Sequence, residues 1–118
     1  MENDVTLKLK RGVKLPVIMA PMFLISNPKM VLDACKAGII GTFPLLNART
    51  AEVLDQWMLE IKTGMQKLKE ERSNEELPMW GVNFVSHHSA NKRYNEDLAL
   101  IEKHQPDRKS TRLNSVTQ

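Results

Sequence analysis

The sequence predicts an α/β fold in which short buried strands alternate with helices. Three apolar runs of strand length, at residues 15–20, 39–43 and 80–85, are rich in β-branched or aromatic side chains. A segment with helical periodicity follows each run. Connections of this kind are crossovers, so they require a parallel sheet covered by helices. Periodicity alone does not distinguish between two arrangements of such a sheet, an open doubly wound sheet and a closed barrel.

The first strand leads into a helix predicted over residues 28–37. Ser26 and Asn27 offer a capping side chain, and Pro28 suits the first helical turn. Gly38 then ends the helix, because glycine readily adopts the left-handed conformation that closes one.

The second unit carries the strongest periodic signal in the chain. Its strand, residues 39–43, stops at Pro44, and Thr50 can cap the helix that follows. The apolar positions of this helix recur about every 3.6 residues and are Val53, Leu54, Trp57, Met58, Ile61, Met65 and Leu68. Residues 69–76 are polar and dense in charge, which indicates a solvated helix end or loop.

The third unit joins a strand at residues 80–85 to a weaker helical pattern at residues 91–104. From Asp107 the chain becomes polar, and Leu113 and Val116 are its only large apolar residues there. We therefore expect no buried fourth strand in this part. We interpret residues 1–105 as the domain and residues 106–118 as a polar tail that is not native to the fold.

Composition excludes two classes of protein. Hydrophobic residues make up 42% of the 118 residues, and no apolar run approaches the roughly 20 residues of a membrane-spanning helix. We therefore expect neither a membrane protein nor a disordered one. The single Cys35 cannot form an intramolecular disulfide, and the first residues lack the basic and apolar start of a secretory signal. These features predict a cytoplasmic protein.

The charge distribution argues against a nucleic-acid partner. The net charge is +3 and lies mostly in the polar tail. The basic residues near the N-terminus have no aromatic neighbours on which bases could stack.

Functional groups of a parallel sheet lie in the loops at the carboxyl ends of its strands. Here these loops are residues 20–26, 44–50 and 83–93. In the first, Met22 and Phe23 can either contact a flat ligand or simply cap the core. That loop lacks the Gly-x-Gly-x-x-Gly turn of dinucleotide-binding sheets, which favours the barrel.

Polar residues in the other two loops are the candidates for hydrogen bonding. Asn47 and Arg49 follow the second strand, and Asn83 interrupts the third. The amide of Asn83 can bond either the edge of a heterocycle or a neighbouring strand. His87 and His88 are adjacent, so their rings point in different directions, and the chain has no zinc-ligand spacing. We expect no metal site.

Four sequence blocks, in this order, carry a family resemblance. They are LPVIMAPMFLIS at residues 15–26, ACKAGIIGTFP at 34–44, LNART at 46–50 and GVN at 81–83. Together they resemble the opening of the nitronate monooxygenases, formerly called 2-nitropropane dioxygenases, and the match runs to about residue 105. The Ala-Pro-Met element also opens related flavin barrels such as the flavin-dependent enoyl reductases.

The resemblance implies an FMN-dependent (β/α)₈ barrel of the TIM type, of which this chain is the N-terminal fragment of about three βα units. It implies oxidation of alkyl nitronates by molecular oxygen to a carbonyl compound and nitrite. By the same motif, Ala20, Pro21 and Met22 would lie against the isoalloxazine ring. Asn47 and Asn83 would hydrogen-bond the flavin or its ribityl chain.

The resemblance assigns no catalytic residue in this chain. The catalytic histidine of the family and its phosphate-binding loops belong to later strands, and neither His87 nor His88 replaces that histidine. A closed barrel typically needs about 250 residues. We therefore expect the 118-residue chain to bind FMN weakly or not at all and to show no turnover.

Two other readings remain. The chain could be a non-catalytic fragment that acts only by associating with another chain through exposed sheet edges. It could also be a relative of the flavin-dependent enoyl reductases, which would use NADPH and a fatty acyl substrate.

Overall fold

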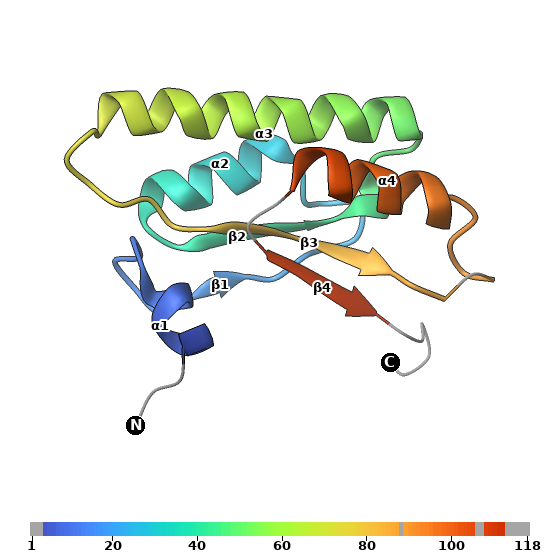
Figure 1. Ribbon diagram of the computed structural model, residues 1–118, viewed down its shortest axis with the longest axis horizontal. Helices are drawn as coiled ribbons and strands as arrows, with labels where there is room; N and C mark the ends of the chain where they lie inside the picture. The colour runs from blue at the N-terminus through green and yellow to red at the C-terminus, as the bar shows by residue number, and fades with distance from the viewer. Residues whose placement is uncertain (1–3, 88, 106–107, 113–118) are drawn as a thin grey trace.

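A parallel sheet runs through the molecule and is covered on one face by helices (Figure 1). The computed structural model describes residues 4–87, 89–105 and 108–112. The strands of this part are β1 (Ile18–Met19), β2 (Ile40–Pro44), β3 (Trp80–Val85) and β4 (Arg108–Arg112). They pair in parallel, and their order in the sheet is their order in the sequence. The α/β class is therefore confirmed.

Three helices lie together on one face of the sheet (Figure 1). They are α2 (Pro28–Ala37), α3 (Ala51–Glu71) and α4 (Tyr94–His104). The short helix α1 (Asp4–Lys10), which the sequence did not predict, lies beside β1 on the other side. A 3₁₀ turn, η1 (Leu45–Asn47), follows β2 directly.

The helix ends form where local chemistry predicted them. The Asn27 side chain accepts a hydrogen bond of 2.9 Å from the Met30 N–H, and Gly38 ends α2 at a φ of 91°. The Thr50 hydroxyl accepts from the Val53 N–H at 3.1 Å and begins α3. Local signals were sufficient here because each cap involves residues close in sequence.

The core lies between the sheet and these three helices. Phe43 of β2 meets Trp57 of α3 edge-on, with ring centroids 5.9 Å apart, and Phe84 of β3 meets Tyr94 of α4 at 5.2 Å. Since side chains alternate along a strand, the neighbours of Phe84 on β3 face the opposite side of the sheet. That side is free of α2, α3 and α4, and we call it the open face.

Helices α2 and α3 approach closely at Gly64. A Cβ atom placed there would lie 2.6 Å from Cδ1 of Leu32, well inside van der Waals contact. The absence of a side chain at this position therefore sets the spacing of the two helices.

The first strand is much shorter than the predicted residues 15–20. Pro16 has no N–H to donate, and the Val17 N–H bonds the Leu15 carbonyl locally at 2.7 Å. Only Ile18 and Met19 are left to pair with β2. The predicted extent of this strand was wrong because local hydrogen bonds compete with sheet pairing.

The polar tail contains a strand that the sequence analysis did not expect. The backbone of Arg108–Arg112 pairs with β3, with Gly81 opposite Arg108 and Val85 opposite Arg112. Backbone groups pair whatever the polarity of the side chains, and β3 offers an unpaired edge. A fourth strand is therefore present at these residues, although the polar composition of the tail did not predict one. Residues 106–107 and 113–118 lie outside the described ranges.

No helix within the described ranges has the length and the apolar composition that crossing a bilayer requires.

Candidate functional site

The loop after β1, the end of β2 with the turn η1, and the end of β3 meet at one edge of the sheet and border a cavity of about 340 Å³. We call it the carboxyl-edge cavity. Its lining residues come in pairs from the three chain segments and are Pro21, Phe23, Pro44, Leu46, Asn83 and Val85. Two residues that the sequence analysis selected, Pro21 and Asn83, thus line the same cavity although they lie far apart in sequence.

The pleat of β3 explains why Asn83 lies at this cavity. Val82 and Phe84 are 2% and 5% exposed and pack in the core, so the residue between them faces the open side. Asn83 stands opposite Pro44 in the register of the sheet. Asn83 therefore lies at the end of two adjacent strands, where it is the polar side chain in an otherwise apolar lining.

The loop after β1 is held in place by Asn47. The Oδ1 atom of Asn47 accepts from the Leu24 N–H at 2.9 Å, and Nδ2 donates to the carbonyls of Met22 at 2.9 Å and Ser26 at 2.8 Å. The Ser26 hydroxyl accepts in turn from the Met22 N–H at 2.8 Å. Both amide hydrogens of Asn47 are therefore bonded to carbonyls of the protein. The residue is buried, with 8% of its surface exposed.

This loop presents an apolar tip to solvent. Phe23, Leu24 and Ile25 are 61%, 63% and 59% exposed. Leu24 adopts a left-handed conformation with a φ of 66°, which is unusual for a residue other than glycine. The hydrogen bond from its N–H to Asn47 holds it in this conformation.

Ala20 and Met22 belong to the same loop but do not line the carboxyl-edge cavity. Ala20 is exposed directly after β1, and Met22 is half-buried with its N–H and carbonyl both bonded. Of the five predicted residues, two line the cavity, one fixes the loop and two form part of that loop. Their assignment to a flavin stays a prediction.

A buried polar cluster at the same edge was missed by sequence reasoning. The Asn91 amide donates to the Val85 carbonyl at 2.9 Å and accepts from the Arg93 N–H at 3.0 Å. Arg93 donates from Nη2 to the Leu45 carbonyl at 3.2 Å, and its Nε lies 3.4 Å from Oδ1 of Asp97. The cluster ties the start of α4 to the ends of β2 and β3.

Burial raises the pKa of the Asp97 carboxyl, and the nearby Arg93 charge opposes that rise. Asp97 is fully buried. The one sequence feature that could have indicated this cluster is the spacing of four residues between Arg93 and Asp97 at the start of a helix. That spacing is also common on solvated helices, so it does not identify a buried pair.

His87 does not line the carboxyl-edge cavity. The His87 Nδ1 atom lies 2.7 Å from the Ser89 hydroxyl on the surface, and His88 is outside the described residues. In the part of the chain that the structure describes, no three His, Cys, Asp or Glu residues come together as a metal site.

Comparison of the chain with protein-family models, with curated proteins and with solved structures finds no match. The site is therefore interpreted from its own residues and geometry.

Proposed function

We propose that the chain forms the amino-terminal part of an FMN-dependent (β/α)₈ barrel that oxidises alkyl nitronates with molecular oxygen. The products are a carbonyl compound and nitrite. The observation that carries the proposal is the carboxyl-edge cavity, to which Pro21 and Asn83 both contribute. The sequence blocks at residues 15–50 and 81–83 supply the substrate class by their resemblance to nitronate monooxygenases.

The arrangement of strands and helices supports a barrel over a doubly wound sheet. In a doubly wound sheet the strand order reverses and helices cover both faces. In a barrel, consecutive strands are neighbours and the helices lie outside. Here the order is β1-β2-β3-β4, and α2, α3 and α4 share one face. The open face then corresponds to the inside of the barrel.

The carboxyl-edge cavity fits the ring system of a flavin in size and chemistry. Its volume of about 340 Å³ lies within the usual range for small-molecule sites. Pro21, Pro44 and Leu46 provide an apolar wall for a planar ring, and Asn83 provides an amide for the polar edge of that ring.

When bound, FMN would supply the redox chemistry, and the protein would supply binding and orientation. In this division Pro21 contacts the ring and Asn83 orients it. Asn47 does not contact the ring in this proposal but positions Pro21, because its amide holds the loop that carries Pro21. The phosphate of the cofactor is typically bound by loops after the seventh and eighth strands, which these four strands do not supply.

The first test is the intact mass and the absorbance spectrum of the gene product purified from its source cells. We expect a mass well above 13.5 kDa together with a flavin spectrum and oxygen uptake with an alkyl nitronate. In that flavoprotein, Asn83→Ala should reduce flavin affinity, and Asn74→Ala, in the loop after α3, is the matched control. A product of 13.5 kDa without flavin contradicts the proposal. Activity with NADPH and an enoyl substrate, but not with a nitronate, would favour the reductase instead.

The isolated 118-residue chain provides the second test. After incubation with FMN and removal of the excess, we expect little retained flavin and no oxygen uptake with a nitronate, because the phosphate-binding loops are missing. Stoichiometric flavin together with turnover would show that the four strands are sufficient and that this expectation is wrong.

A further inference from the structure

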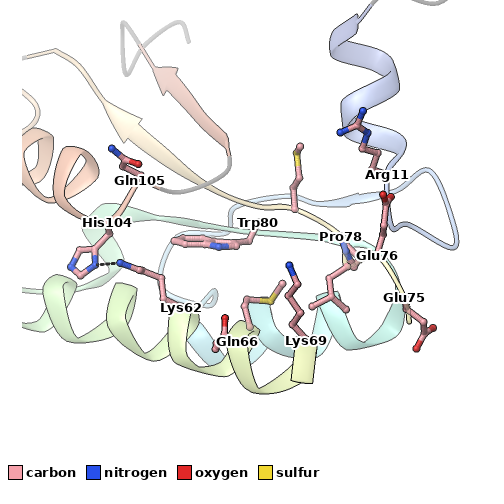
Figure 2. Close-up of a pocket in the computed structure, with 13 residues that line it drawn as sticks. Arg11, Lys62, Gln66, Lys69, Glu75, Glu76, Pro78, Trp80, His104 and Gln105 are labelled. Carbon is pink, nitrogen blue, oxygen red and sulfur yellow. Dashed lines mark hydrogen bonds between the residues drawn. The ribbon is translucent and has the colours of Figure 1, made fainter. Parts of the chain in front are cut away.

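A second cavity, of about 650 Å³, lies at the opposite edge of the sheet, where β3 begins (Figure 2). We call it the amino-edge cavity. Its walls are the inner side of α3, the segment that leads into Trp80, and the end of α4 with His104 and Gln105. It shares no lining residue with the carboxyl-edge cavity, so the two sites can be tested independently.

Two lysines on α3 face this cavity. Lys62 and Lys69 are seven residues apart, which is about two helical turns, so they lie on the same side of the helix. Figure 2 shows the Lys69 side chain directed from α3 towards the strand that carries Trp80, whereas the Lys62 side chain is directed towards His104. The two lysines therefore line the same open pocket from one side of the helix.

Two contacts in series, from Asp55 to His104 and from His104 to Lys62, orient the Lys62 side chain. The Nζ atom of Lys62 lies 3.5 Å from Nδ1 of His104, and Nε2 of His104 lies 2.5 Å from Oδ1 of Asp55. An ammonium group can only donate, so Nδ1 is the acceptor and Nε2 carries the hydrogen that is donated to Asp55. The His104 side chain is only 4% exposed, and its ring therefore has a fixed orientation.

The carboxylates around the amino-edge cavity do not neutralise these lysines. Figure 2 shows the Glu76 side chain directed towards Arg11, whereas Glu75 points away from the other lining residues. Trp80 lines the same cavity as the two lysines. An anion in this space would have two charged donors on one side and an aromatic wall on the other.

We propose that the amino-edge cavity binds a phosphate-bearing small molecule, with Lys62 and Lys69 donating to phosphate oxygens and Trp80 forming the opposite wall. Lysine is a common point-charge donor to phosphate, and charge-assisted hydrogen bonds of this kind are among the stronger ones in proteins. The volume is sufficient for a ligand of metabolite size.

The test uses the 118-residue chain with inorganic pyrophosphate as the probe. Binding is measured by titration calorimetry and by the fluorescence of Trp80 in a Trp57→Phe background. We expect saturable binding at one site with a change in Trp80 emission. Lys62→Gln and Lys69→Gln should each weaken binding about tenfold, as expected for loss of one charged donor.

The matched control is Lys67→Gln, because Lys67 is an exposed residue of the same helix that does not line the cavity. It removes the same charge and should change the affinity less than twofold. Glu76→Gln removes a nearby negative charge and should tighten binding. All four variants change exposed side chains, and circular dichroism verifies their folding.

Two results would overturn the proposal. Lys67→Gln could weaken binding as much as Lys62→Gln, which would indicate diffuse surface charge instead of a site. Pyrophosphate could also fail to saturate the chain at all. Both results concern the amino-edge cavity alone and leave the proposed flavin chemistry untouched.

Discussion

The side-chain amide of Asn47 determines the shape of the loop after β1. Its three hydrogen bonds reach Leu24, Met22 and Ser26, which lie 21 to 25 residues earlier in the chain. The sequence could indicate that a polar residue at this loop matters, because it follows a buried strand. It could not identify the partners, because the contact forms only after two strands have paired.

Replacing Asn47 with alanine should destabilise the protein by about 1–3 kcal/mol, because backbone groups of the loop would lose their partners in a buried position. Leu24 would also lose the bond that holds its left-handed conformation. Urea unfolding measures the difference.

Asn74→Ala is the matched control for this experiment, since Asn74 lies exposed in the loop after α3. We expect its unfolding midpoint to stay close to that of the wild type. Equal midpoints for the two variants would show that the Asn47 bonds contribute nothing to stability.

At the scale of elements, α3 and α4 are joined by the carboxylate of Asp55. It accepts from Nε2 of His104 at 2.5 Å and from Nζ of Lys103 at 3.0 Å. Hydrogen bonds from His104 and then Lys103 lower the pKa of Asp55 below its usual value of 3.8. The ionised carboxylate therefore favours the folded state.

This link predicts a dependence of stability on pH. Because the pKa of Asp55 is lower in the folded state, its contribution is present above pH 3.8 and is lost as the pH falls through the folded pKa. Asp55→Asn should therefore lower the urea midpoint at pH 7, and the difference from the wild type should shrink in acid.

Asp33→Asn provides the comparison for Asp55→Asn. Asp33 pairs with Lys29 at 2.8 Å on the exposed face of α2, where ion pairs contribute little. Its effect at pH 7 should be smaller than that of Asp55→Asn. A pH-independent difference for Asp55→Asn would refute the assigned link between the helices.

The elements differ in how far the sequence could predict them. The strand Trp80–Val85 and the helix Pro28–Ala37 match their predicted ranges, because a short apolar run and helix caps are local signals. Local signals did not predict the extent of the first strand or the presence of the fourth. Their extent depends on which backbone groups of β2 and β3 are left to pair, and that is a property of the assembled sheet.

At the scale of the whole molecule, α2, α3 and α4 cover one face of the sheet, and apolar side chains are exposed elsewhere. Ile18 in β1 is 53% exposed, and Leu15 and Val17 in the segment before it are 59% and 46% exposed. Apolar side chains at the edge of a sheet favour pairing with another chain. The alternation of elements predicted the α/β class, whereas the distribution of helices over the two faces required the structure.

We expect the 118-residue chain to associate as its concentration rises. Sedimentation velocity at increasing concentration measures the effect. Ile18→Lys places a charge on the edge strand and should shift the molecule towards the monomer.

Leu59→Lys is the matched control for association. Leu59 is 56% exposed but lies on helix α3, away from the edge of the sheet. It should leave the association unchanged. A chain that stays monomeric at all concentrations would contradict the expected role of the edge.

The close approach at Gly64 has a consequence for natural variation of this chain. A side chain at position 64 would collide first with the flexible end of Leu32, not with backbone. The collision is therefore relieved by shortening the residue at position 32. Among natural variants, an alanine at position 64 should be accompanied by a smaller residue at position 32, so that the two positions change together in evolution.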